Sequence, residues 1–232
     1  MQFLFNNAPN PMKVALLLEE LGIAYEAIPV DTRKGEQFKA EFLAMNPNAK
    51  VPVIVDEGVI VFDSNAILLY LAEKTGRFLP ASNTPAVRGP LLSWLMFVAS
   101  GIGPYSGQAV HFRHYAPEPK DYALNRYDFE AERHWKILDD RLAQHPYMLG
   151  SVYTIVDMAV WGWARLIPTV MGSQESWAKF PNVKRLLDEI SARPAAAGVE
   201  RLRNLHTFKA EMDDEARHNM FGHLARQKTA NP

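Results

Sequence analysis

Polar side chains stand at the starts of two predicted helices near the beginning of the chain, where they could hold an anion. Asn10 opens one helical segment together with Pro11, and Asp63 and Ser64 precede a second. The first turn of a helix presents unpaired backbone N–H groups and a partial positive charge, so an amide or hydroxyl there can help to bind a negative ligand. The same residues are also ordinary helix caps, which is the simpler interpretation of each one alone.

Some reaction classes are excluded by residues that the sequence lacks. The 232 residues contain no cysteine, so a disulfide, a zinc–thiolate site and a cysteine nucleophile are impossible. Residues 1–24 also contain no Tyr, Ser or Thr. His111 and His114 have no further histidine or carboxylate at a helpful spacing, so we expect no metal site.

The bulk composition argues against two kinds of partner. Hydrophobic residues make up 48% of the chain, and the formal net charge is −1, so no positive field attracts nucleic acid or an anionic membrane. The first residues lack the basic and apolar regions of a signal peptide. The most apolar stretch, residues 91–102, is shorter than the about 20 residues that span a bilayer, so we expect a buried helix there and a cytoplasmic protein.

The first 80 residues are predicted to form an α/β domain around a mixed four-stranded sheet. Apolar and β-branched segments mark strands at residues 2–5, 25–30, 51–55 and 59–62. A helix with Asn10 at its cap and Gly22 at its end separates the first two strands, which should therefore form a βαβ unit and run parallel. The last two strands flank a short turn with Gly58 and should form an antiparallel hairpin. Ser64 is expected to cap the next helix.

Beyond a linker with two prolines, the chain is predicted to be all helical. Helical patterns cover residues 94–102, 122–142, 155–166 and 183–192. Thr154 and Asp157 have the spacing of an N-terminal capping box. Gly101, Gly103 and Gly107 could break a helix that lines a cleft, but no strand precedes them, so phosphate binding is not expected. We divide the chain into domains at 1–80 and 86–206 and a C-terminal extension at 207–232, whose last residues should be disordered.

Three motifs, in this order, resemble the glutathione transferase superfamily. Residues 46–52 resemble the segment that ends in the family's cis-proline, here Pro52. Residues 62–67 resemble the Glu/Asp-Ser element that holds a γ-glutamyl group, and residues 154–157 resemble a helix cap in the core of the helical domain. Each motif is weak alone, but their order and distances make the resemblance strong over roughly residues 1–205. It implies a thioredoxin-like N-terminal domain, an all-α C-terminal domain and a homodimer.

Finer features are similar to the bacterial Nu class, whose members resemble disulfide reductases that use glutathione as the reductant. These features lie at residues 9–10, 34–38, 101–104 and 107–112. The Nu-class pattern has a Thr where this chain has Ala8, so a hydroxyl group that could activate a thiol is missing. Asn10 remains at the opening of the first helix.

The resemblance implies a site for glutathione, a thiol tripeptide with two carboxylates and one ammonium. Its thiolate is the reactive form, and we expect the side-chain amide of Asn10 and nearby backbone N–H groups to receive it. A cis-Pro52 would turn the backbone of Val51 toward the cysteinyl backbone of glutathione, like an added strand. Ser64 would bind the γ-glutamyl carboxylate, and Asp63 would contact the ammonium.

Further contacts with glutathione are implied at the edges of this site. Gln37 and Lys50 are candidates for the glycyl end, although Lys50 could equally be a solvated charge. Three residues of the helical domain match Nu-class positions: Gln108, His111 and Arg126. Arg126 would pair with a carboxylate of glutathione or of a second glutathione molecule. The competing interpretation is an ion pair between Arg126 and Glu130, four residues further along the helix.

Four functions follow as alternatives. In the first, which the sequence favours, a glutathione thiolate attacks a small disulfide and a second glutathione resolves the mixed disulfide, giving glutathione disulfide without a metal. In the second, the thiolate is conjugated to an apolar electrophile. The third is a regulatory module that binds glutathione with little catalysis, and the fourth is a scaffold for protein assembly that binds no glutathione.

Overall fold

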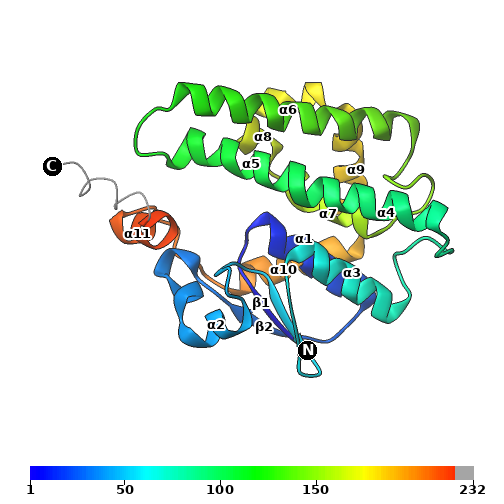
Figure 1. The fold of residues 1–232 in the computed structure, drawn as a ribbon, viewed down its shortest axis with the longest axis horizontal. Helices are drawn as coiled ribbons and strands as arrows, with labels where there is room; N and C mark the ends of the chain where they lie inside the picture. Colours follow the sequence, from blue (N-terminus) through cyan, green and yellow to red (C-terminus); the bar gives the residue numbers. More distant parts are fainter. Residues whose placement is uncertain (223–232) are drawn as a thin grey trace.

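The structure, a computed structural model, describes residues 1–222. A sheet with its flanking helices forms one part, and a bundle of helices lies against it as the second part (Figure 1). The predicted fold class, an α/β thioredoxin-like domain followed by an all-α domain, is therefore confirmed. The disorder expected at the end of the chain falls outside the described residues.

Four short strands form the sheet in the order β2-β1-β3-β4. They are β1 (Gln2–Phe5), β2 (Glu26–Pro29), β3 (Val53–Asp56) and β4 (Val59–Phe62). β1 and β2 are parallel, with Phe3 opposite Ala27, whereas β3 is antiparallel to both β1 and β4. The predicted βαβ unit and hairpin are both confirmed.

Alternating side chains of β1 separate two layers of the N-terminal domain. Phe3 and Phe5 are buried in the core formed with α1 (Pro9–Leu21) and α3 (Ser64–Thr75). Leu4 belongs to a smaller cluster with Phe42 of α2 (Ala40–Met45), as expected when successive side chains of a strand point to opposite faces. Two 3₁₀ turns, η1 (Thr32–Lys34) and η2 (Glu36–Phe38), connect β2 to α2. The helices that start near the predicted site, α1 and α3, therefore share one face of the sheet.

The helical domain is built around one long helix and its neighbours. α4 (Pro85–Phe97), η3 (Val98–Ile102), α5 (Gly103–Val110) and η4 (His111–Tyr115) follow one another without a break, and η3 and η4 are π-helical turns. The other helices are α6 (Asp121–Gln144), α7 (Ile155–Ala164), α8 (Ile167–Met171), the 3₁₀ helix η5 (Gln174–Lys179), α9 (Pro181–Ser191) and α10 (Pro194–Leu205). The predicted break near Gly101 is thus a π-turn. A Cβ on Gly101 would lie 2.4 Å from the ring of His134, so only glycine lets α6 approach this closely.

This long helix corrects the length expected from the sequence. It has 31 residues, and by length and composition alone it could cross a membrane. Core helices of water-soluble proteins meet the same criterion. Leu91, Leu95, Val98 and Ile102 are buried on one face of this helix, whereas Met96 in the same stretch is 46% exposed. The buried helix predicted over residues 91–102 is therefore only partly buried.

α7 starts in the interior at a well-defined cap. The Asp157 carboxylate accepts hydrogen bonds from the backbone N–H groups of Thr154 (2.8 Å) and Met148 (2.7 Å), and the Thr154 hydroxyl accepts one from Val156. The predicted capping box is confirmed. It holds α7 in place at the centre of the molecule.

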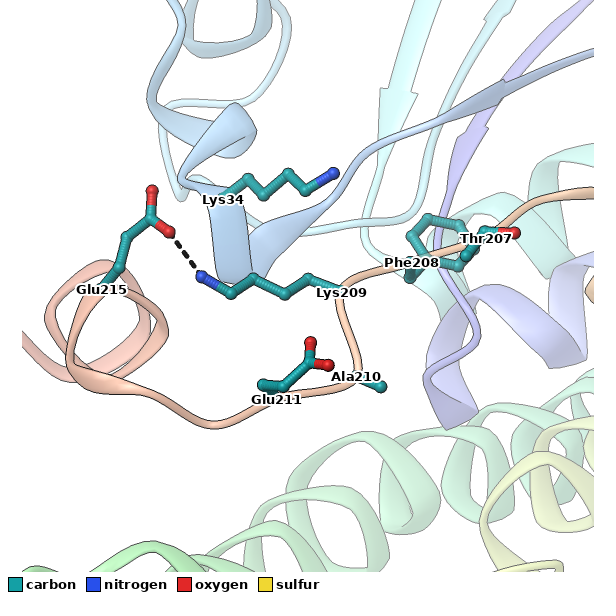
Figure 2. Close-up of a pocket in the computed structure, with 7 residues that line it drawn as sticks. All are labelled: Lys34, Thr207, Phe208, Lys209, Ala210, Glu211 and Glu215. Atoms are coloured by element: carbon teal, nitrogen blue, oxygen red, sulfur yellow. Dashed lines mark hydrogen bonds and ion pairs between the residues drawn. The ribbon is translucent and has the colours of Figure 1, made fainter.

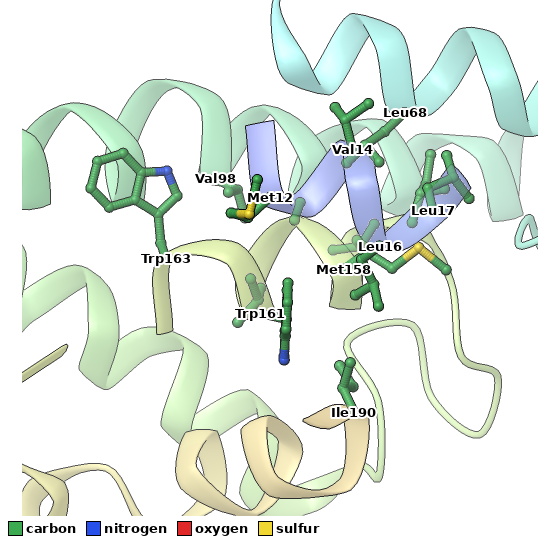
Figure 3. Packing of buried hydrophobic residues seen from close by; sticks show 14 of the residues in the cluster. Met12, Val14, Leu16, Leu17, Leu68, Val98, Met158, Trp161, Trp163 and Ile190 are labelled. Carbon is green, nitrogen blue, oxygen red and sulfur yellow. The ribbon is translucent and has the colours of Figure 1, made fainter. Parts of the chain in front are cut away.

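α1 and α7 join the two domains through a continuous apolar core. Figure 3 shows Met12 and Leu16 of α1 beside Met158 and Trp161 of α7. The two helices cross at Gly162, where an added Cβ would lie 2.8 Å from the Pro9 carbonyl oxygen and 2.9 Å from the Lys13 Cβ. The first turn of α1 is therefore clamped against the helical domain.

Candidate functional site

The first turn of α1 concentrates its free donors on one residue. The cap position is Ala8, which offers no side chain for capping, and its own N–H donates to Asn6 Oδ1 at 3.0 Å. Pro9 and Pro11 carry no backbone N–H, and the N–H of Met12 donates to the Ala8 carbonyl at 3.2 Å. The prediction that Asn10 is the helix cap is wrong: it is the second residue of α1. Its backbone and side-chain N–H groups are the donors that this turn can offer an anion.

The side chain of Asn10 is oriented from the other domain. Its Oδ1 accepts a hydrogen bond of 3.0 Å from the indole Nε1 of Trp163 in α7. Because the oxygen is engaged, the Nδ2 group is the end of the amide left to donate. Trp163 is buried in the core, and its orienting contact with Asn10 was not predicted from the sequence. A buried indole N–H needs an acceptor, which was the available signal.

The loop before β3 has the predicted backbone. The Val51–Pro52 peptide bond is cis. Asn46 supports this loop, since its Nδ2 donates to the Lys50 carbonyl at 2.6 Å and its Oδ1 accepts from the N–H of Asn48 at 3.0 Å. The Lys50 side chain is exposed. Contacts of Val51, Pro52 and Lys50 with a ligand stay predictions.

The start of α3 corrects a second capping assignment. Asp63, with φ 67°, is the cap, and its Oδ1 accepts from the N–H groups of Asn65 (2.8 Å) and Ala66 (3.2 Å). Ser64 is the first residue of the helix and is buried. Asp63 therefore does the capping that the sequence analysis gave to Ser64, and the Ser64 hydroxyl is not needed for it.

A cavity of about 590 Å³ opens beside the first turn of α1. Six separate parts of the chain line it: residues 6–9, 31–33, 107–115, 163–166 and 208–210, and Met220. Gly107, which lies on α5, also lines the cavity, as the sequence analysis proposed for the helix that carries this glycine. The lining is mainly apolar, with polar side chains from the segments around Asn6 and Asp31, and it includes Pro9, the residue before Asn10.

Comparison with known proteins identifies the family. The glutathione S-transferase N-terminal domain family matches residues 3–73, and the C-terminal domain family matches residues 122–189. The disulfide-bond oxidoreductase YfcG of Escherichia coli is 39% identical over 218 residues, which cover 91% of this chain and 96% of the relative. The chain belongs to the glutathione transferase family.

Other members of this glutathione transferase family extend the similarity. The disulfide-bond oxidoreductase YghU of Escherichia coli is 40% identical over 204 residues, covering 81% of this chain and 69% of the relative. A glutathione transferase from Burkholderia graminis, with two glutathione molecules bound per subunit, superposes with a TM-score of 0.78 at 34% identity, covering 86% of this chain and 87% of that one. Streptococcus pneumoniae YghU, complexed with glutathione, superposes with a TM-score of 0.79 at 37% identity, covering 90% and 83%.

In this glutathione transferase, a C-terminal strap (residues 207–213) and helix α11 (Asp214–Phe221) cover the cavity. The strap is held to the N-terminal domain, because the N–H of Lys209 donates to Asp31 Oδ2 at 2.7 Å and its carbonyl accepts from Arg33 at 3.0 Å. A second hollow of about 550 Å³ lies along the strap, and Figure 2 shows the Lys209 side chain there, reaching Glu215 at the start of α11.

α11 touches both domains and so closes one side of the cavity. The Nδ2 of Asn219 donates to the Arg33 carbonyl at 2.9 Å in η1. On the other side, the ring of Phe221 lies 4.7 Å from that of His111 and 5.8 Å from that of Tyr115, between ring centroids. No helix was predicted within the extension from residue 207, so the docked helix α11 was missed.

Gln37 lies beneath α11. Its Nε2 donates to the carbonyls of Thr32 (3.2 Å) and Asn219 (3.4 Å), and its Oε1 is buried without a partner among the described residues. The role of Gln37 at the glycyl end of glutathione stays a prediction. In the present arrangement its amide N–H groups are used by the protein itself.

The remaining predicted residues lie on the long helix and on α6. Gln108 is exposed on α5. Arg126 forms the ion pair with Glu130 that the sequence left as the alternative, with Nη1 and Oε1 2.9 Å apart. His114 Nε2 contacts the Thr169 carbonyl at 2.9 Å. Within residues 1–222, no group of histidine and carboxylate side chains could hold a metal ion.

Proposed function

We propose that this glutathione transferase is a glutathione-dependent disulfide-bond oxidoreductase of the Nu type. The observation that carries the proposal is the first turn of α1, where two prolines and a cap without a hydroxyl leave Asn10 as the donor. Its chain neighbour Pro9 and its hydrogen-bond partner Trp163 both line the cavity. The names of YfcG and YghU, both disulfide-bond oxidoreductases, support the same reaction.

The proposed reaction uses glutathione for all of the sulfur chemistry. The thiolate of one glutathione attacks a disulfide sulfur, forming a mixed disulfide and releasing the first thiol of the substrate. A second glutathione attacks the mixed disulfide, releases the second thiol and forms glutathione disulfide. Two thiols are thereby oxidised to one disulfide while the substrate disulfide is reduced to two thiols. The protein needs no cysteine, and it has none.

The predicted contact residues would hold different parts of the bound glutathione. Asn10 stabilises the thiolate with its N–H groups, supported by the positive end of α1. Ser64 and Asp63 hold the γ-glutamyl end, and the Val51 backbone before Pro52 pairs with the cysteinyl backbone. The outer contacts are assigned to Gln37, Lys50, Gln108 and Arg126, with Gln37 and Arg126 exchanging their present partners for the ligand.

Conjugation to an electrophile is the second candidate, because the apolar lining of the cavity would suit an apolar substrate. The test is to compare kcat/KM for a small disulfide with that for a chlorodinitrobenzene-type electrophile, both with glutathione. Faster disulfide turnover supports the reductase, and the reverse ranking supports conjugation. Calorimetric binding of glutathione without turnover of either substrate would indicate a regulatory module instead.

The proposal extends to assembly and location. A homodimer is supported by exposed apolar side chains on the edge strand β4, on α4 and on α6: Val59, Ile60, Phe62, Met96 and Phe129. A cytoplasmic location follows from the reaction, because thiols are kept reduced there by glutathione. We also retain domain limits at 1–80 and 86–206, with 207–232 as an extension.

A further inference from the structure

Lys13 is a positive charge in the interior of the protein. It is 1% exposed and ranks among the largest fully buried side chains. A lysine ammonium is strongly hydrated, so its complete burial is costly unless other groups compensate for the lost water. Buried ionisable groups are concentrated at functional sites, and Lys13 follows Asn10 by three residues on α1.

The contacts of Lys13 lead directly to the start of α3. Its Nζ donates to Asn65 Oδ1 at 2.9 Å. The backbone N–H of Asn65 in turn donates to the cap, Asp63. Gly162 of α7 lies against the Lys13 Cβ, so closely that no larger residue would fit at position 162. Lys13 is thus fixed between three helices.

Lys13 can gain or lose its proton near neutral pH. Burial lowers its pKa to about 7, while the negative charge of Asp63 opposes that shift. Asp63 is the charged group that acts on Lys13; Asn65 on α3, Gly162 on α7 and Asn10 on α1 are uncharged. A new negative charge near the first turns of α1 and α3 would therefore favour the protonated lysine.

We propose that Lys13 is a positioning residue for glutathione, whose buried ammonium holds the first turn of α3 through Asn65 and balances the negative charge of the bound thiolate. The inference rests on the proposed function, since it needs the thiolate at Asn10 and the γ-glutamyl carboxylate at Ser64. Lys13 lies three residues after Asn10, on the same face of α1. Its ammonium is buried, and a charge in the interior acts on neighbouring charges with little screening by solvent.

The proposal makes the proton balance of binding measurable. When glutathione binds as the thiolate, its thiol releases one proton. A protein molecule whose Lys13 is neutral before binding takes up one proton from solvent when glutathione binds, because the lysine becomes protonated. Near pH 7, about half of the ligand-free molecules have a neutral Lys13. Binding of one glutathione should therefore release about half a proton less to the buffer than binding to a site that lacks this lysine.

The test compares three variants of the full-length chain. Lys13→Met removes the charge and the hydrogen bond and fills the same space with an apolar side chain, a replacement that buried charges often tolerate. Lys13→Gln removes the charge but keeps a donor for Asn65. Asn65→Ala is the matched control, because it breaks the same hydrogen bond and keeps the charge. Glutathione is titrated calorimetrically in buffers of different ionisation enthalpy, and the bound thiolate is titrated by its ultraviolet absorbance.

At a pH where the bound thiol is ionised in every variant, both lysine variants should release about half a proton more on binding than the wild type. They should also raise the pKa of the bound thiol by about one unit, which is a tenfold smaller acid dissociation constant. Asn65→Ala should weaken binding but leave the pKa of the bound thiol near its wild-type value, because the lysine is still present to be protonated. The inference is overturned if Asn65→Ala behaves like Lys13→Met, or if Lys13→Gln restores the wild-type values. Glutathione that binds with an unchanged thiol pKa in both lysine variants overturns this inference alone, whereas a wild type that binds no glutathione overturns the proposed function as well.

Discussion

Asn10 combines two features that a thiolate-binding residue needs, a free donor and a fixed orientation. Replacing it in Asn10→Ala removes the side-chain donor and keeps the backbone N–H and the helix. A hydrogen bond to a charged group contributes about 1.5–3 kcal/mol, so kcat/KM for a small disulfide should fall about 10–100-fold. The pKa of the bound thiol should rise in parallel. Steady-state kinetics with glutathione and thiolate absorbance measure the two effects.

Trp163→Phe separates donation from orientation at the same site. It keeps an aromatic ring in the core but removes the N–H that holds Asn10 Oδ1. The amide can then rotate, so we expect a loss of activity smaller than that of Asn10→Ala. Full turnover by Asn10→Ala would show that another group stabilises the thiolate, and the account of the first turn of α1 would be wrong.

At the scale of the elements, the capping box of α7 makes stability depend on pH. Burial raises the pKa of Asp157 from 3.8 to about 6, against the hydrogen bonds that it accepts. The folded protein thus holds this proton up to a higher pH than the unfolded chain. Protonation of Asp157 therefore stabilises the folded state. This contribution is complete below pH 3.8 and is lost as the pH rises through about 6.

Asp157→Asn should therefore be more harmful in acid than at neutral pH. The amide cannot titrate and accepts at only one oxygen, so we expect a loss of about 1–3 kcal/mol in the free energy of unfolding. The difference from the wild type should shrink as the pH rises through about 6. Urea unfolding, followed by tryptophan fluorescence on either side of that pH, measures it. Asp140→Asn, at an exposed ion pair with Lys136, should change stability by less than about 0.5 kcal/mol at either pH.

α11 and the strap should limit which substrates reach the cavity. A chain that ends at His206, or Ala216→Asp at the buried face of α11, would release this cover. We expect kcat/KM for a bulky disulfide to rise about tenfold relative to a small one, which corresponds to ~1.4 kcal/mol. Glu211→Gln, an exposed position on the same strap, serves as the control. An unchanged ratio in both uncovered variants would mean that α11 does not restrict entry.

Local patterns predicted most elements, and distant contacts account for the errors. The hairpin and the capping box each depend on a few neighbouring residues, whereas the cis-Pro52 was implied by the resemblance to the family. The choice between Asp63 and Ser64 as the cap of α3 could not be made locally, because both types cap well. The hydrogen-bond partners of Asn10 and Gln37 could not be predicted because they are distant in sequence. Trp163 lies 153 residues from Asn10, and Asn219 lies 182 residues from Gln37.

At the scale of the whole molecule, one edge of the sheet exposes apolar side chains. β4 is one of the two edge strands, and its residues Val59, Ile60 and Phe62 are 49%, 45% and 43% exposed. An apolar edge strand invites pairing with other chains unless something covers it. Met96 on α4 and Phe129 on α6 add exposed apolar area on the helical domain. These surfaces are the ones that the proposed homodimer would bury.

Phe62→Glu should convert the homodimer to a monomer, because a buried charge without a partner is costly at an interface. Sedimentation equilibrium measures the mass directly, and the dissociation constant should rise at least 100-fold, about 2.7 kcal/mol. Leu205→Glu on α10, where the side chain is 74% exposed, introduces the same charge elsewhere and should leave the dimer intact. A wild-type chain that sediments as a monomer, or a Phe62→Glu chain that dimerises as tightly as the wild type, would place the interface elsewhere or remove it. Activity that survives in the monomer would further show that each active site is complete within one chain.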